Sequence, residues 1–232
     1  GGIPLDWARA IERNSEALKG IVAVLFAMLG LEEGAATMER LPHAVHRAVL
    51  RVLQPAESAV RRLIVIVARG LVVKPVLARP MPKEPIIGRG GRSRPSFKLF
   101  DPRKSFALLR EGTLPRFLPR IHVFGHDPRV AALWAARPPL AAPAPSPDDL
   151  VNAEPLTRRL EALKSALDDL PRQARRLVRL RLRRENVPSL KFKSPLRPGP
   201  PPGHRRKKLH EIDEVLAECH GLAWDALRLN SS

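Results

Sequence analysis

The sequence predicts an all-α fold, in which a short helical bundle and a C-terminal helical pair are joined by long Pro-rich irregular segments. Apolar residues recur at helical spacing in the first 73 residues and again from residue 155 onward. The 25 prolines gather between and after these stretches, and aromatic residues make up only 4% of the chain, with no tyrosine. Few bulky rings are therefore available to fill one large core. We expect three parts: a helical unit at 1–73, a basic Pro/Gly-rich irregular region at 74–154 and a helical pair at 155–232.

The first part is expected to contain three helices. The first spans about 6–31, with Asp6 as its N-cap and a stop at Gly34. Pro42 suits the first turn of a second helix, because its fixed φ and missing N–H cost nothing there. Pro55 is expected to interrupt that helix and to start a third one, because proline breaks a helix interior. Short joints between the three predict a small bundle.

The middle part changes character at residue 74. Prolines and glycines follow one another closely there, and they remove hydrogen-bond donors and add backbone entropy. One short helix at 102–111 is the exception that we expect. The stretch 138–147 (PPLAAPAPSP) is a low-complexity linker of the extended, polyproline type.

Heptad spacing marks the C-terminal part. Leucines and alanines spaced alternately four and three residues apart predict an apolar seam at 156–177. Pro171 lies inside this seam, which predicts a kink or two helices that meet near Asp169. A second Pro-rich linker is expected at 187–204.

A final helix is expected at about 208–229, with its own apolar seam at 209–226. Its acidic face could pair with the Arg-rich helix before it. The spacing fits an intramolecular helical hairpin, and it fits equally a homo-oligomer that forms through 156–177 or 209–226.

The charge is strongly positive and unevenly distributed. Lys and Arg number 41 against 23 Asp and Glu, which leaves +18. The first 41 residues carry a net −2, whereas 42–147 carry +14 and 158–208 carry +13. Clustering of this kind is typical of a protein that binds a polyanion. A GC-rich genome, which inflates arginine together with alanine, proline and glycine, is the alternative explanation for 31 Arg against 10 Lys.

The leading hypothesis is a non-enzymatic protein that binds nucleic acid with low sequence specificity. Arg89, Arg92 and Arg94 belong to a short RGG/RS-like segment, a type that binds single strands through charge and guanidinium stacking. The other expected phosphate contacts lie in the C-terminal part: Arg172, Arg175, Arg176, Arg179, Arg183, Arg184, Arg205, Arg206, Lys207 and Lys208. Phosphate contacts position a protein on nucleic acid and do not read its bases.

Two other functions remain open from the sequence. Residues 20–31 and 60–74 are apolar runs. Lys19 and the pair Glu32-Glu33 close the first, whereas Arg and Lys frame the second, which would suit an anionic membrane surface. The run at 20–31 is too short to cross a bilayer, which takes about 20 residues. The two runs could instead pack together as helical core. An adaptor that pairs its heptads with another helical protein is the third possibility.

Enzymatic chemistry has the least support. The sequence holds no phosphate-binding GxxxxGK[ST], no HExxH and no GxSxG. Its single cysteine, Cys219, excludes an intrachain disulfide and falls on the apolar seam, where we expect a small buried hydrophobe. No local histidine cluster offers more than two ligands, so we expect no metal site and no cofactor.

Three runs resemble a bacterial family of Arg/Pro-rich proteins: RRLIVIVARG at 61–70, FDPRK at 100–104 and RPGPPPGHRR at 197–206. The resemblance would cover most of the chain. It transfers no site and no activity, and it implies only a bacterial, intracellular setting. We therefore expect a cytoplasmic protein, at the inner face of the membrane if the lipid-binding alternative holds.

Overall fold

The chain, described by a computed structural model, is mostly helical. Its described residues are 6–31, 39–73, 95–102, 146–185 and 194–229. Residues 1–102 and 147–232 form one compact unit, so the N-terminal and C-terminal helices, which we expected to be separate, share one core. The helix expected at 102–111, nearly all of the linker at 138–147, and Arg89, Arg92 and Arg94 lie outside the described residues.

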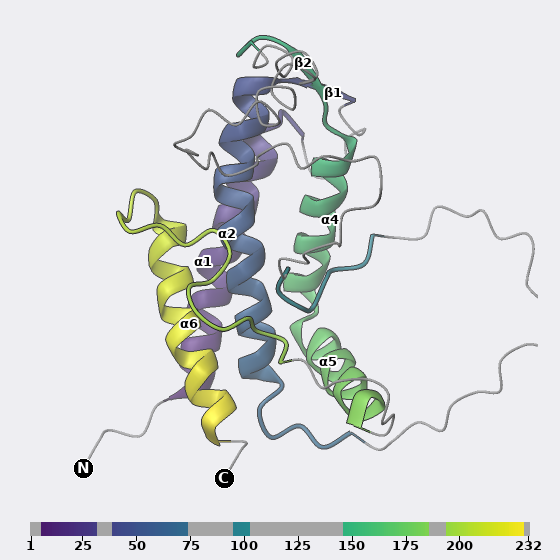
Figure 1. The fold of residues 1–232 in the computed structure, drawn as a ribbon, viewed down its shortest axis with the longest axis vertical. Helices are drawn as coiled ribbons and strands as arrows, with labels where there is room; N and C mark the ends of the chain where they lie inside the picture. The colour runs from purple at the N-terminus through teal and green to yellow at the C-terminus, as the bar shows by residue number, and fades with distance from the viewer. Residues whose placement is uncertain (1–5, 32–38, 74–94, 103–145, 186–193, 230–232) are drawn as a thin grey trace, which may run out of the picture. The chain divides into compact units, whose positions relative to one another are not determined.

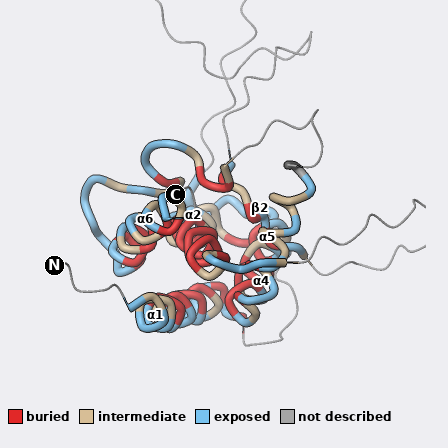
Figure 2. The backbone as a smooth tube through the Cα atoms, turned by 90° about the horizontal axis from the view of Figure 1, so that it is seen from below, coloured by how far each residue is buried: buried red, intermediate tan, exposed pale blue. Residues whose placement is uncertain are grey.

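Helix α2 (His43–Val67) is the centre of this unit (Figure 1). Four other helices pack on it: α1 (Trp7–Met28), α4 (Glu154–Asp168), α5 (Leu170–Glu185) and α6 (Glu211–Leu229). Figure 2 looks along the bundle and shows α5 and α6 on opposite sides of α2.

Helix α1 begins as predicted and ends earlier. The Asp6 carboxylate accepts a hydrogen bond from the backbone N–H of Arg9 at 3.1 Å, which confirms the N-cap. The helix ends at Met28, and Gly30 takes a left-handed φ of +63°. A left-handed glycine is a common helix terminator. The predicted stop at Gly34 is therefore wrong for this helix, although Gly34 itself lies outside the described residues.

The expectation that Pro55 separates two helices is wrong, because α2 runs through it without a break. Pro55 has no N–H for the carbonyl of Arg51, four residues earlier. Arg205 supplies the missing donor, since its Nη2 donates to that carbonyl oxygen at 2.6 Å. The backbone of Gly203 lies directly against the proline: a Cβ added there would be 2.6 Å from the Pro55 nitrogen. A segment about 150 residues later thus satisfies the backbone of α2 at its proline.

Two short strands, which we did not predict, hold the start of α2. Strand β1 (Arg40–Pro42) pairs antiparallel with β2 (Leu150–Asn152), with Leu41 opposite Val151. No side chain caps α2. The backbone next to β2 takes that role: the N–H groups of His43 and Ala44 donate to the carbonyls of Asp149 and Pro147, each at 2.9 Å. Strands of three residues are too short to show an alternating pattern.

The junction between α4 and α5 confirms the prediction of two helices that meet near Asp169. Asp169 has a non-helical φ of −136° and ψ of 63°, and its carboxylate accepts a hydrogen bond from the N–H of Arg172 at 3.0 Å. Pro171 lies in the first turn of α5, where proline is tolerated.

The first heptad seam, and the second one from Ile212 onward, are buried inside this one chain. The leucines and alanines of the seam at 156–177 are all buried. In the second seam Ile212, Leu216, Cys219, Ala223 and Ala226 are buried, whereas Leu209, its predicted first residue, is 69% exposed and precedes α6. The predicted hairpin is wrong, because α6 packs chiefly on α2 and not on α5. A homo-oligomer through either seam would require the unit to open, since the same side chains form its core.

The Pro-rich stretch 187–204 is not a linker over its described part. Pro195, Leu196 and Pro201 are buried, and the Pro195 carbonyl accepts a hydrogen bond from the N–H of Asp101 at 2.9 Å. The described parts of 61–70, 100–104 and 197–206 therefore meet at α2, since Asp101 and Gly203 both contact that helix.

The two apolar runs considered for membrane contact are buried to different extents. Ile64 and Ile66 are 1% and 3% exposed, and residues 60–66 are buried throughout. In the run at 20–31, five of the twelve residues are buried, while six, among them Val24 and Met28, are exposed. Among the described helices, none is long and apolar enough to span a membrane. Contact of 60–66 with lipid is incompatible with this packing, whereas Leu71 and Val72, at the end of the predicted run 60–74, are exposed.

Candidate functional site

Helix α5 carries a row of arginines on the face that points away from the core. Arg172, Arg175, Arg179 and Arg183 are all exposed. Their spacing of three, four and four residues places them within an arc of about 80°, at ~100° per residue. We call these four residues the arginine stripe. Leu170, Ala174 and Leu177, on the opposite side of the helix, are buried.

The arginine stripe has no acidic partner within the described part of the chain. None of the ion pairs described there involves its four guanidinium groups. Arg175 donates only to the carbonyl of Pro171, at 3.3 Å. Asp169 is engaged at the helix N-terminus, where it caps α5. The stripe therefore presents its positive charge to solvent.

Two of the predicted phosphate contacts have structural roles instead. Arg176 is half-buried and donates to the carbonyl of Phe97 at 2.9 Å, which fastens α5 to the segment 95–102. Arg205 donates a hydrogen bond to the carbonyl of Arg51, which has no helical donor because Pro55 lacks an N–H. The side chain of Arg184 lies outside the described residues. Spacing alone could not separate these arginines from the exposed ones, because their partners are distant in sequence.

Arg206, Lys207 and Lys208 are exposed, but they lie away from the arginine stripe. They precede α6, and α6 and α5 flank opposite sides of α2 (Figures 1 and 2). The structure thus divides the predicted site into two separate groups of cations.

The most buried cation, Arg62, was not among the predicted site residues. Its side chain is fully buried, and its Nη2 lies 3.0 Å from Oδ2 of Asp101, which is also fully buried. Its Nη1 donates to the carbonyl and the hydroxyl of Ser58 at 2.8 and 2.9 Å, and its Nε donates to Nδ1 of His220 at 3.1 Å. Burial lowers the pKa of Arg62, and Asp101 opposes that shift. This cluster joins three segments of the chain.

Arg61 and Arg159 share a second acid, Glu57. Arg159 grips the Glu57 carboxylate with two hydrogen bonds of 2.8 and 3.0 Å, and Arg61 lies 3.3 Å from it. The guanidinium of Arg61 also lies 5.5 Å from the centre of the Phe97 ring. These ion pairs join α2 to α4 and neutralise part of the charge of both arginines.

His220 and Cys219 are adjacent in α6 but form no catalytic pair. Nδ1 of His220 accepts from Arg62, so the ring proton resides on Nε2. Burial and, after it, the charge of Arg62 lower the pKa of His220. Cys219 is fully buried, and burial raises the pKa of its thiol to about 12.

We expect Cys219 to be unreactive toward a thiol reagent at pH 8 in the folded chain, because only the thiolate is nucleophilic and burial suppresses it. Colorimetric thiol titration should show less than a tenth of the thiol reacting within the time that suffices for full reaction in denaturant. Rapid native-state labelling at pH 8 would contradict the buried, protonated thiol.

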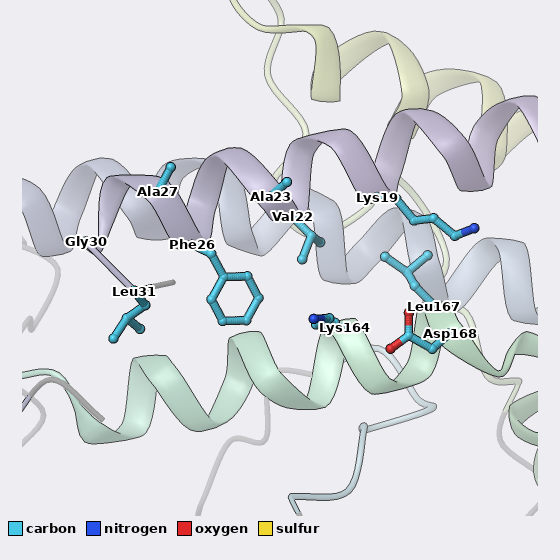
Figure 3. A pocket seen from close by; sticks show the side chains of 10 residues that line it. All are labelled: Lys19, Val22, Ala23, Phe26, Ala27, Gly30, Leu31, Lys164, Leu167 and Asp168. Carbon is cyan, nitrogen blue, oxygen red and sulfur yellow. The ribbon is translucent and has the colours of Figure 1, made fainter. Parts of the chain in front are cut away.

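An apolar groove lies between α1 and α4 (Figure 3). Its volume is about 620 Å³, and Val22, Phe26 and Leu167 line it. Lys164 reaches over the Phe26 ring at 5.7 Å, and Lys19 pairs with Glu16 at 2.7 Å. No arginine of the stripe lines this groove, so it is separate from the candidate polyanion surface.

In the described ranges, no three His, Cys, Asp or Glu side chains come together in a way that could hold a metal ion. Comparison of the chain with protein-family models, curated proteins and solved structures gives no match. The functional argument therefore depends on the exposed cations.

Proposed function

We propose that this chain binds the phosphate backbone of nucleic acid, with little sequence preference, through the arginine stripe of α5. The observation that carries the proposal is the row of four exposed guanidinium groups, which no carboxylate within the described residues neutralises. The two arginines that are buried among the described residues, Arg61 and Arg62, are both paired with Asp or Glu, and this contrast favours an outside anion for the stripe.

The geometry of the stripe suits a chain of phosphates. Side chains three and four residues apart on a helix lie about 5–6 Å from one another. From Arg172 to Arg183 the stripe extends over roughly 16 Å of helix axis, at ~1.5 Å per residue. A guanidinium group can donate two parallel hydrogen bonds to a phosphate. The stripe can therefore meet several phosphates of one strand at once.

Helix α5 is held in place before any ligand arrives. Leu170, Ala174 and Leu177 are buried, and Arg176 is bonded to the carbonyl of Phe97. A rigid helix loses little conformational freedom when it binds, which favours affinity. Arginine that contacts phosphate carries no sequence information, so binding should vary little between probe sequences.

Binding to a short duplex should fall steeply with salt, because each neutralised phosphate releases counterions. Four contacts predict a slope of log K against log salt concentration of about −3.6, at ~0.9 per phosphate on duplex DNA. The variant R175Q/R179Q/R183Q should flatten this slope and weaken binding at 50 mM salt. Fluorescence anisotropy of labelled duplex and single-stranded probes measures both quantities.

The matched control is R9Q/R40Q/R47Q, which removes three exposed arginines outside α5 and so lowers the net charge equally. Glutamine keeps a helix propensity close to that of arginine, so α5 should remain folded in the stripe variant. Equal weakening by both variants would mean that net charge and not the stripe attracts the probe. Absence of binding by the parent chain at low salt would refute the proposal.

A further inference from the structure

A second exposed basic surface lies on the loop 203–210, which we call the basic loop. Arg206, Lys207 and Lys208 are exposed there and enter no ion pair within the described residues. Arg51, also exposed, belongs to the turn of α2 to which the loop is attached.

The basic loop is fixed at both ends. At its start, Gly203 packs on Pro55 and Arg205 donates to the carbonyl of Arg51 at 2.6 Å. At its end, the buried Asp213 carboxylate accepts from the N–H groups of Leu209 and His210 at 3.0 and 3.2 Å. The three cations between these attachments therefore lie on a segment whose backbone is held in place at both ends. The exposed carboxylates that follow them, Glu211 and Glu214, belong to the first turn of α6 and enter no described ion pair.

The basic loop and the arginine stripe face different directions. The stripe is opposite the buried face of α5 and so points away from α2. The basic loop leads into α6, and both views place α6 on the other side of α2 from α5 (Figures 1 and 2). One helix thus separates two groups of exposed cations.

A short duplex cannot easily reach both groups. Duplex DNA has a persistence length of about 150 base pairs, and bending a site of 20–30 base pairs by 40–90° costs on the order of 1–6 kcal/mol. A second duplex can contact the basic loop without that cost. We infer that one molecule of this protein joins two duplex segments, one on the arginine stripe and one on the basic loop. This inference rests on the proposed binding by the stripe.

The test uses two 20-base-pair duplexes of different sequence, each with its own fluorophore, and the full chain at 50 mM salt. Fluorescence cross-correlation measures how much of the two colours diffuses together, and anisotropy measures the binding of one duplex. The parent chain should join the two colours. The variant R206Q/K207Q/K208Q should still bind one duplex but lose at least tenfold of the joined signal, whereas R9Q/R40Q/R47Q should keep it.

Each result has a definite meaning. A parent chain that binds one duplex but joins none overturns the inference and leaves the proposed function standing. Joining that survives in R206Q/K207Q/K208Q also overturns it, because the bridge would then run through two stripes of a self-associated protein. Absence of duplex binding by anisotropy refutes the proposed function itself. Circular dichroism of each variant shows that the helices remain folded.

Discussion

Replacement of Asp101 by asparagine should destabilise the folded unit by about 3–5 kcal/mol, the usual cost when one partner of a buried ion pair is removed. The guanidinium of Arg62 has no exposed surface, and Asp101 holds it at 3.0 and 3.4 Å. An asparagine amide would leave that buried cation without its counter-charge. The Asp101 carboxylate also accepts from the N–H of Arg197 at 3.2 Å, so the loss would reach the segment that packs next to it.

Urea unfolding followed by circular dichroism measures this loss. The control is Asp225→Asn, an exposed aspartate of α6, which should change stability by less than about 0.5 kcal/mol. The double variant R62M/D101N should be more stable than D101N alone, because it removes the uncompensated charge as well as its partner. Equal stability of D101N and D225N would mean that Asp101 and Arg62 are not a buried pair.

The sequence correctly predicted those features of the fold that depend on residues close together in the chain. The N-cap at Asp6 and the junction at Asp169 follow from residues within three positions of them. The seam at 156–177 correctly identified a buried face, although its partners are helices of the same chain and not a second copy. Packing partners are long-range information that periodicity does not contain.

Helix α2 shows why a local rule can give the wrong answer. Proline in a helix interior costs a hydrogen bond, and this cost predicts a break at Pro55. The structure offsets the cost with Arg205, which is 154 residues away in the chain. The residues around Pro55 give no sign of that distant donor. The rule that proline breaks a helix therefore fails here, because a residue from elsewhere in the chain replaces the lost hydrogen bond.

In the candidate site, too, some side-chain positions could be predicted from the sequence and others could not. Exposure of the arginine stripe follows from the seam, because Arg172, Arg175, Arg179 and Arg183 fall on the face opposite Ala174 and Leu177. The interior position of Arg62 does not follow from its neighbours, because Arg61 and the apolar run that begins at Leu63 suggested a cation at the edge of a lipid-facing run. The local sign of it was Ser58, four residues earlier on the same helix face, whose hydroxyl accepts a hydrogen bond from Arg62. The counter-charge that allows Arg62 to be buried is Asp101, which is 39 residues away in the chain.

The close contact between Gly203 and Pro55 leads to the second large expected effect. Gly203 has a φ of +82°, which costs any other residue about 1–2 kcal/mol. A methyl group there would also lie 2.6 to 2.9 Å from three atoms of Pro55, two of them in the backbone of α2. Overpacking of this kind typically adds about 1–3 kcal/mol. Gly203→Ala should therefore destabilise the unit by roughly 2–5 kcal/mol in total.

Gly199→Ala is the matched control, because the chain offers a second glycine of the same conformation without the contact. Gly199 has a φ of +79°, and nothing lies within 4 Å of a Cβ added to it. Its substitution should cost only the left-handed penalty of about 1–2 kcal/mol. The difference between the two alanine variants in urea unfolding isolates the contact with Pro55. If both variants lost the same free energy of unfolding, the loop at Gly203 would not pack on α2. The hydrogen bond from Arg205 to the Arg51 carbonyl would then be in doubt as well, because Gly203 holds that loop against the helix.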